Sequence, residues 1–405
     1  MPDQSPTIFL SAGEASGEHY GALLMEELIS RFGSSGIEPR FIGMGGNRME
    51  ALGLQCIVRS EDVAVMGITE IVRHLPQIYR EYRKLKSAIQ TLRPDIAVLI
   101  DFPDIHLKLA SEFQRLGIPV IFFVSPQLWA WKKGRIRKVQ RFVDRMLVIF
   151  PFEEPFYRER SVDARYVGHP LADLPLPAIT TEEFAKANGL DPERTWIGLL
   201  PGSRIKEIRL NLPGMLASAR LLLKNNHGLQ FVLPLAPTLT AMQRQEALAM
   251  AEAEAQALGK LPLKFVDDAR ATLFRCRASI VASGTATVEA ALIGNPFVVV
   301  YRVSPLTYAI AKRVVTVPHV AMVNLVADQR LVPELIQDDF HPPAVVQALE
   351  PLLADGPARS KMVAGLAEVG RKLRSGRAAE ETAIGTVAGE VLAMLQNGKP
   401  GMAQV

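Results

Sequence analysis

Short, continuous runs of apolar residues recur along this sequence, and a longer stretch with helical periodicity follows each of them. Because their apolar residues do not alternate with polar ones, the runs are typical of parallel strands that helices cover on both faces. Such alternation of strands and helices predicts an α/β architecture. The expected strands form two series: 7–11, 96–100, 120–124 and 146–150, then 196–200, 231–233, 263–266, 279–282 and 297–301.

The two series divide the 405 residues into two expected domains of similar size, with a cleft between them. A segment with four prolines separates the series and predicts a connection, and an Ala-rich helix precedes a loose tail at the end of the chain. The predicted parts are an N-terminal domain at 1–169, a linker at 170–195, a C-terminal domain at 196–375, and a final helix with its tail at 376–405.

Composition narrows the class of function. A net charge of +4 and an isoelectric point of about 9.0 permit an anionic partner but lack the wider basic surface of a nucleic-acid binder. Cys56 and Cys276 lie far apart without neighbouring metal ligands, which excludes a disulfide scaffold and a zinc ribbon. We expect neither a signal peptide nor a membrane-spanning helix.

The segment 11–18, SAGEASGE, directly follows the first expected strand. Its small residues permit a tight turn, and the next helix would present free N–H groups to an anion. Glu14 and Glu18 place two carboxylates at this turn, although Ser16 and Glu18 suit helix capping equally well. The dinucleotide fingerprint Gly-x-Gly-x-x-Gly is absent.

The segment 101–104, DFPD, follows the strand expected at 96–100. Open α/β sheets bind ligands at the carboxyl ends of their strands, and a partly desolvated carboxylate there can act as a general base. Taken by itself, the motif favours an Asx turn or a helix cap as the role of either aspartate.

Two further segments suggest contact with a lipid surface. In the segment 125–138, SPQLWAWKKGRIRK, two tryptophans precede a cluster of Lys and Arg. Indole rings suit a membrane interface or a sugar face, and cations suit phosphates. A solvated basic helix with one packed tryptophan would have the same sequence. The apolar segment 61–75 is either core or a patch for acyl chains. The residues of this predicted patch are Trp129, Trp131, Lys132, Lys133 and Arg135, together with Val65, Met66, Ile68, Ile71 and Val72.

Two motifs in the C-terminal half are suited to anions. In the segment 201–204, Gly202 permits close backbone approach, while Ser203 and Arg204 can contact a phosphate. The segment 283–289 would open a helix at Ser283, Gly284 and Thr285, with Glu289 one turn further on to accept from ribose hydroxyls. Each could be a plain capping turn, but together they favour a site for a nucleoside diphosphate.

No Asp-x-Asp or His-Glu-x-x-His motif occurs in the sequence. We therefore expect neither a metal nor another cofactor. An enzyme of this kind would neutralise a leaving diphosphate with helix dipoles and arginine rather than with Mg²⁺.

Taken together, the motifs give the chain a resemblance to the lipid-A-disaccharide synthase family that spans nearly its whole length. One departure is Glu18, where the family's first motif usually ends in Asp. The stretches that carry the resemblance, in the family's order, are SAGEASGE, GMGGNRMEALG, EDVAVMGITEI, DFPDIHLKLA, VSPQLWAWKKGRIRK, GHPLAD, LPGSRIKEI and ASGTATVEAAL.

The resemblance implies a metal-independent, inverting glycosyltransferase of the GT-B fold, with two facing Rossmann-like domains. Its substrates would be UDP-2,3-diacylglucosamine and 2,3-diacylglucosamine 1-phosphate (lipid X), and its products the β-1,6 disaccharide 1-phosphate of lipid A and UDP. The implied location is the cytoplasmic face of the inner membrane of Gram-negative bacteria, with peripheral attachment.

The resemblance also implies roles for residues. The N-terminal half would hold the acceptor and the lipid-facing patch. From the position of Asp101 after the strand expected at 96–100, we predict this residue as the base, with Glu14 and His19 as rivals. The C-terminal half would hold UDP at Gly202, Ser203, Arg204, Ser283, Gly284, Thr285 and Glu289, with Tyr301 and Asn324 nearby.

Two other functions remain open at this point. One is a UDP-N-acetylglucosamine transferase or epimerase of the same fold, whose soluble substrate would not need the apolar segment 63–75. The other is a lipid- or nucleotide-binding module without activity, against which the carboxylates at the expected strand ends argue.

Overall fold

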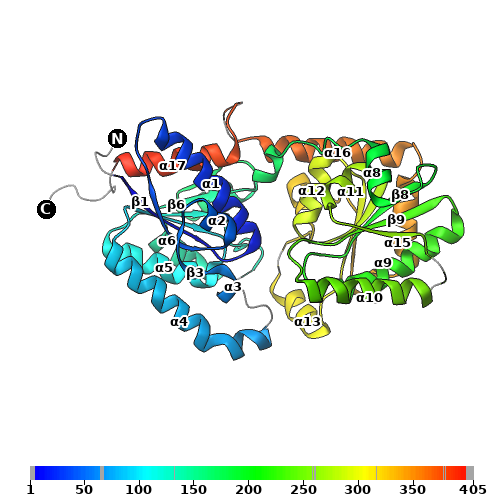
Figure 1. Ribbon diagram of the computed structural model, residues 1–405, viewed down its shortest axis with the longest axis horizontal. Coiled ribbons are helices and arrows are strands. Elements are labelled where there is room, and N and C mark those ends of the chain that lie inside the picture. Colours follow the sequence, from blue (N-terminus) through cyan, green and yellow to red (C-terminus); the bar gives the residue numbers. More distant parts are fainter. Residues whose placement is uncertain are drawn as a thin grey trace. The chain divides into compact units, whose positions relative to one another are not determined.

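The computed structural model describes residues 5–63, 68–131, 133–257, 259, 261–315, 317–376, 378 and 380–397. The chain divides into two compact units, one formed by 1–173 with 374–405 and the other by 174–373. Each unit contains one sheet in which all strand pairs are parallel, with helices between the strands (Figure 1). The predicted α/β class with two parallel sheets is confirmed.

The first unit alternates strands and helices from its start. Its strands are β1 (Thr7–Ala12), β2 (Arg40–Gly45), β3 (Gln55–Arg59), β4 (Ile96–Ile100), β5 (Val120–Phe123), β6 (Arg145–Val148) and β7 (Ala164–Tyr166). Its helices are α1 (Ala15–Gly33), α2 (Asn47–Ala51), α3 (Ser60–Val63), α4 (Ile68–Leu92), α5 (Pro103–Leu116), α6 (Ile136–Phe142), α7 (Glu153–Arg158) and α17 (Ala383–Asn397).

The strands of the first sheet run in the order β3-β2-β1-β4-β5-β6-β7. The four strands predicted in this half are all present, and β2, β3 and β7 were not predicted. All five residues of β4 are buried, as a continuous apolar strand covered on both faces requires. The order reverses between β1 and β4, and ligands of open α/β sheets bind at the carboxyl ends of strands at such a reversal.

The C-terminal helix α17 belongs to the first unit, although the sequence suggested a separate final segment at 376–405. It lies along α1, and both helices are labelled in Figure 1. The N–H of Ala383, the first residue of α17, donates to Asp173 Oδ2 at 2.8 Å. Thus α17, at the C-terminal end of the chain, completes the layer of helices that covers the first sheet.

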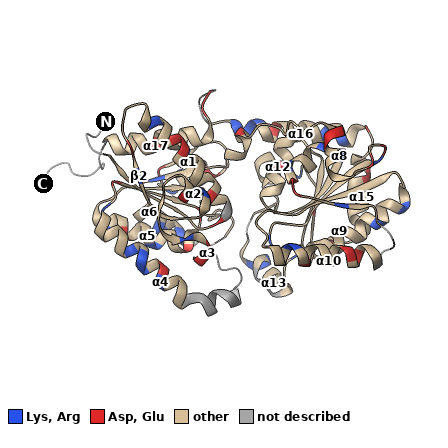
Figure 2. Cartoon of the chain, viewed as in Figure 1, with Lys and Arg blue, Asp and Glu red and all other residues tan. Residues whose placement is uncertain are grey.

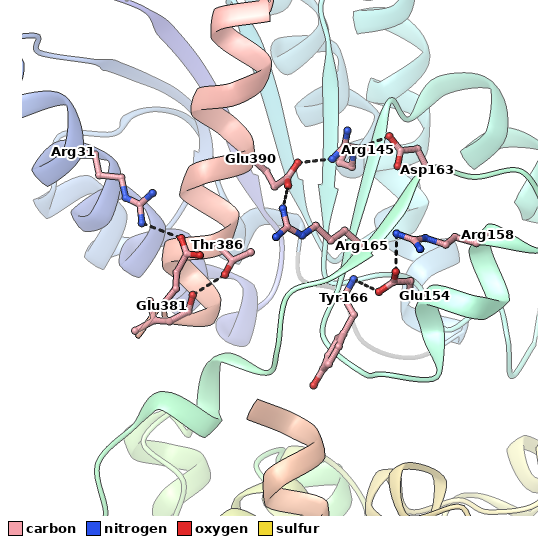
Figure 3. Close-up of polar contacts among 11 residues, drawn as sticks. Arg31, Arg145, Glu154, Arg158, Asp163, Arg165, Tyr166, Glu381, Thr386 and Glu390 are labelled. Atoms are coloured by element: carbon pink, nitrogen blue, oxygen red, sulfur yellow. Dashed lines mark hydrogen bonds and ion pairs between the residues drawn. The ribbon is translucent and has the colours of Figure 1, made fainter. Parts of the chain in front are cut away.

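Figure 3 shows the polar contacts that fix α17. Glu390 is 7% exposed, and its carboxylate accepts hydrogen bonds from Arg145 on β6 and Arg165 on β7. Near the start of the helix, Arg31 on α1 pairs with Glu381 at 3.5 Å. These ion pairs specify which helix covers the end of the sheet.

The second unit repeats the pattern. Its strands are β8 (Thr195–Leu200), β9 (Leu229–Pro234), β10 (Leu263–Val266), β11 (Ala278–Ala282), β12 (Phe297–Tyr301) and β13 (Glu334–Ile336). Its helices are α8 (Thr181–Asn188), α9 (Ile205–Asn225), α10 (Ala241–Ala257), α11 (Ala269–Arg275), α12 (Thr285–Ile293), α13 (Pro305–Val314), α14 (Met322–Ala327), α15 (Pro342–Leu349) and α16 (Pro357–Arg374), whose last residue falls in the first unit.

The second sheet has the order β10-β9-β8-β11-β12-β13, which reverses between β8 and β11. Most of the segment expected to be a linker folds with this unit. Thr180 and Glu183 form a reciprocal capping box at the start of α8, and Phe184 packs in a core cluster with Trp196. The prolines of 170–195 therefore flank a helix instead of marking a bare connection.

Among the described residues, every helix is too short or too polar to cross a bilayer.

Candidate functional site

The structure places two predicted motifs of the N-terminal half beside each other. The turn at 13–14 follows β1 and the turn at 101–102 follows β4, and these strands pair in register through Ala12 and Ile100. Both turns therefore lie at the carboxyl edge of the first sheet where the strand order reverses. Ligands bind at this position in open α/β sheets.

Gly13 brings the two turns into direct contact. A Cβ at this position would overlap the ring of Phe102, so only glycine allows the aromatic ring to pack against the first turn. Glu14 follows Gly13 and Asp101 precedes Phe102 in the chain, and both side chains are half-buried. The packing thus holds these two carboxylates at one edge.

The turn after β4 has an unusual backbone. Asp101 and Phe102 have φ angles of 52° and 53°, in the left-handed region that few residues other than glycine adopt. The backbone N–H of Asp101 donates to the Phe123 carbonyl at 2.9 Å, and its carbonyl lies 2.6 Å from His106 Nδ1. Strain of this kind clusters at functional sites.

Glu18 and His19 both contact Arg48, which the sequence did not single out. The Arg48 N–H donates to Glu18 Oε1 at 3.0 Å, so Glu18 caps α2 from α1. The Arg48 guanidinium donates to His19 Nδ1 at 3.0 Å, and burial and then Arg48 lower the pKa of His19. A ring nitrogen that already accepts from arginine is poorly placed as a base, which favours Asp101 and Glu14 over His19.

Trp129 does not belong with the lipid-facing residues predicted from the sequence. Its side chain is 8% exposed, and its indole N–H donates to Glu153 Oε1 at 3.0 Å. The same carboxylate accepts from the Ser125 hydroxyl at 2.5 Å and from the Phe150 N–H at 3.1 Å. A buried indole that anchors its own loop has no face left for a membrane, so this part of the prediction was wrong.

The other aromatic and basic residues of the segment 125–138 differ in their exposure and contacts. Trp131 is 41% exposed, whereas Arg135 reaches the start of α5 and pairs with Asp104. Arg137 and Lys138 on α6 are exposed, and the basic residues of this helix appear in blue in Figure 2. The ion pair of Arg135 with Asp104 therefore connects the basic segment to the turn that contains Asp101.

Several predicted lipid-patch residues lie outside the described part of the chain. These comprise Val65, Met66 and Lys132, whose placement is not described. The backbone of α4 begins at Ile68, but the side chains of Ile68, Ile71, Val72 and Lys133 are likewise not described. The patch therefore stays a prediction.

The two anion motifs of the second unit also meet at a strand-order reversal. The turn at 201–204 follows β8 and the turn at 283–284 follows β11, and Leu200 pairs in register with Val281. Gly202 has a φ of 122°, and a Cβ there would overlap Glu207. Glu207 accepts the Ser203 N–H at 3.2 Å and lies 3.9 Å from Arg204, so its carboxylate shapes this turn.

Helix α12 opens as the sequence predicted. Ser283 and Gly284 precede it, Gly284 has a φ of 151°, and Thr285 is its first residue. Glu289 lies 3.8 Å from Arg270 on α11. Burial raises the pKa of Glu289, while Arg270 acts in the opposite direction.

Tyr301 and Asn324 have different surroundings. Tyr301 ends β12 close to Arg204 and Glu207, and burial raises the pKa of its hydroxyl. Asn324 has no exposed surface, and its amide bonds to Val332 and Glu334. These hydrogen bonds hold the loop before β13 in place, and a position of Asn324 near the nucleotide stays a prediction.

The sequence reasoning missed Asn211, a buried residue on α9. Its side chain donates to the Pro201 carbonyl at 3.2 Å and accepts from the Arg302 N–H at 2.8 Å. It therefore ties the turn after β8 to the end of β12. A polar residue among apolar ones in the first turns of an expected helix is the only signal that pointed to it.

Within the described ranges, no group of three or more His, Cys, Asp or Glu side chains could hold a metal ion. The independence from metal stays a prediction.

Comparison with known proteins identifies the family. A model described as lipid-A-disaccharide synthetase matches residues 8–385. The chain belongs to this family. A lipid-A-disaccharide synthase of Acidobacterium capsulatum is 61% identical over 394 residues, covering 96% of this chain and 97% of the relative. One of Koribacter versatilis is 47% identical over 377 residues, with coverage of 93% and 95%.

Solved structures agree on the fold. The calicheamicin glycosyltransferase CalG4 matches with a TM-score of 0.59 at 16% identity, covering 98% of this chain and 100% of CalG4. The UDP-GlcNAc 2-epimerase of Methanocaldococcus jannaschii matches with a TM-score of 0.54 at 10% identity, with coverage of 97% and 99%. Transferases and epimerases share this GT-B architecture, so membership of the synthase family, and not the fold, separates the alternatives.

Proposed function

We propose that this protein is a lipid-A-disaccharide synthase that transfers 2,3-diacylglucosamine from UDP to the 6-hydroxyl of 2,3-diacylglucosamine 1-phosphate. The family match over residues 8–385 is the observation that carries the proposal. In the transfer, the acceptor oxygen bonds to the anomeric carbon as the bond from that carbon to the diphosphate breaks. The anomeric configuration inverts, and UDP leaves.

Asp101 is the proposed base that takes the proton of the acceptor hydroxyl. Its turn lies at the reversal point of the first sheet and is packed against Gly13. Glu14, on the adjacent turn, is the remaining rival. A positioned base contributes about 10²–10⁴-fold to the rate.

Arg204 and the N–H groups at the start of α12 are the proposed partners of the leaving diphosphate. Negative charge grows on the β-phosphate in the transition state, and prearranged donors stabilise it without a metal. Ser203, Ser283 and Thr285 would add hydroxyl contacts, and Glu289 would accept from the ribose. Loss of one such donor costs about 3 kcal/mol of transition-state stabilisation.

A membrane surface is the proposed location, because both proposed substrates carry acyl chains. Val65, Met66, Ile68, Ile71 and Val72 would insert shallowly. The exposed Trp131 and the cations of 132–138 would meet anionic headgroups. Each cation near such a surface contributes about 1 kcal/mol, screened by salt. We expect high salt to weaken binding to anionic vesicles only partly, because salt screens the cations but leaves the inserted apolar side chains in place. Complete release by salt would contradict the apolar contribution.

The decisive experiment supplies both lipid sugars and measures the release of UDP. Asp101→Asn should lower turnover by about 10²–10⁴-fold and leave UDP affinity near that of the parent. Asp104→Asn makes the same chemical change three residues away, at an exposed carboxylate, and is the matched control. Near-normal turnover in Asp101→Asn would remove Asp101 from the role, and no UDP release in the parent protein would reject the function itself.

A further inference from the structure

A buried serine and histidine lie behind the turn that carries Asp101. Ser11 on β1 and His106 on α5 both have no exposed surface. Ser11 Oγ lies 2.8 Å from His106 Nε2, and His106 Nδ1 lies 2.6 Å from the carbonyl oxygen of Asp101. This chain of contacts joins β1, α5 and the turn after β4.

The direction of these hydrogen bonds follows from their last acceptor. A carbonyl oxygen can only accept, so Nδ1 of His106 carries the proton. Burial lowers the pKa of His106 to about 4, so the ring is neutral near pH 7 and Nε2 accepts from the Ser11 hydroxyl. Both ring nitrogens are therefore engaged, and the ring cannot itself move a proton to or from a substrate.

The turn that receives this hydrogen bond needs support. Asp101 and Phe102 are successive non-glycine residues in the left-handed region, which is unfavourable for a residue that carries a Cβ. The Phe102 ring packs against Gly13 and meets the His106 ring edge-on, with centroids 5.8 Å apart. His106 thus touches both strained residues.

We propose that His106, oriented by Ser11, is a positioning residue that fixes the backbone of Asp101 so that its carboxylate faces the acceptor hydroxyl. The inference rests on the proposed role of Asp101 as the base. Without the hydrogen bond from Nδ1, the Asp101 carbonyl is free to rotate and the strained turn relaxes. A displacement of about 1 Å at a catalytic group can cost about 10²-fold in rate.

Two amide variants separate the two hydrogen bonds of the ring. In His106→Asn the side-chain nitrogen replaces Nδ1 and can still donate to the Asp101 carbonyl. In His106→Gln it replaces Nε2 and reaches toward Ser11 instead. We expect His106→Gln to lower kcat by about 10²-fold with an unchanged KM for the UDP-sugar, and His106→Asn to restore most of kcat. Equal kcat in the two variants, or loss in proportion to thermal stability alone, would overturn the proposal.

A double-mutant cycle tests whether His106 acts through Asp101. In an Asp101→Asn background, His106→Gln should lower the residual rate by no more than about twofold, because the group it positions is already gone. A full further loss would show that His106 acts elsewhere. If Asp101→Asn alone keeps parental turnover, the proposed base is wrong instead, which distinguishes the two failures.

Ser11→Ala is the milder variant if His106→Gln does not fold. It removes the hydrogen bond that orients the ring and leaves the donor to Asp101 in place. We expect kcat to fall about fivefold, the equivalent of one neutral hydrogen bond, with an unchanged KM. Parental kcat in a folded Ser11→Ala protein would overturn the proposal.

Discussion

Replacing Glu153 with glutamine should make the stability of the first unit strongly dependent on pH. Two buried histidines there resist protonation, since burial lowers the pKa of His106 to about 4 and that of His169 to about 3. In the unfolded chain both titrate near 6.5, so the unfolded state binds more protons below that pH and stability falls as pH falls. From pH 8 to pH 5 the two groups together cost about 4 kcal/mol.

Glu153 has the opposite effect on how stability depends on pH. Burial raises its pKa to about 7 although three donors contact its carboxylate. Its unfolded value is near 4.5, so the folded state binds more protons between pH 4.5 and 7, and stability rises as pH falls through this window. The gain by pH 5 is about 2.5 kcal/mol. The parent should therefore lose only about 1–2 kcal/mol from pH 8 to pH 5, and Glu153→Gln about 4 kcal/mol.

Urea unfolding at pH 8 and pH 5 measures this difference. A Trp196→Phe background leaves Trp129 and Trp131 as the fluorescent reporters, and both lie in the first unit. Glu159→Gln, at an exposed glutamate just after α7, is the matched control and should behave like the parent. Equal pH dependence in Glu153→Gln and the parent would refute the reasoning.

Three other substitutions test the packing by urea unfolding. Glu390→Gln should lower the free energy of unfolding by about 1–2 kcal/mol, because its arginine partners are only partly buried; an unchanged value would show that the ion pairs of Glu390 do not stabilise the docking of α17. Thr180→Ala should cost about 1 kcal/mol, and Thr180→Ser should restore most of it. Trp129→Phe should cost about 1–3 kcal/mol, whereas Trp131→Phe should stay within about 0.5 kcal/mol; the reverse order would contradict their burial.

Much of the fold could be predicted from local pattern. The strand at 96–100 matches β4 residue for residue, because a strand buried on both faces must be apolar throughout. β3 was missed because Gln55 and Arg59 are its end residues and leave only three apolar residues between them, in a strand at the edge of the sheet where one side is not paired. The turns at 101–104, 201–204 and 283–285 were likewise found because each follows such a strand directly.

The sequence by itself determined the strand–helix alternation, the motif turns and the family, since these depend on residue type and order along the chain. Only the tertiary structure decided which turns meet, that Trp129 and Asn324 point inward, and that α17 returns to the first unit. It also decided that Ser11 and His106, 95 residues apart, meet beneath Asp101. The physical reason is that burial and hydrogen bonding depend on contacts between distant segments, and those contacts are fixed by strand order, which no local pattern encodes.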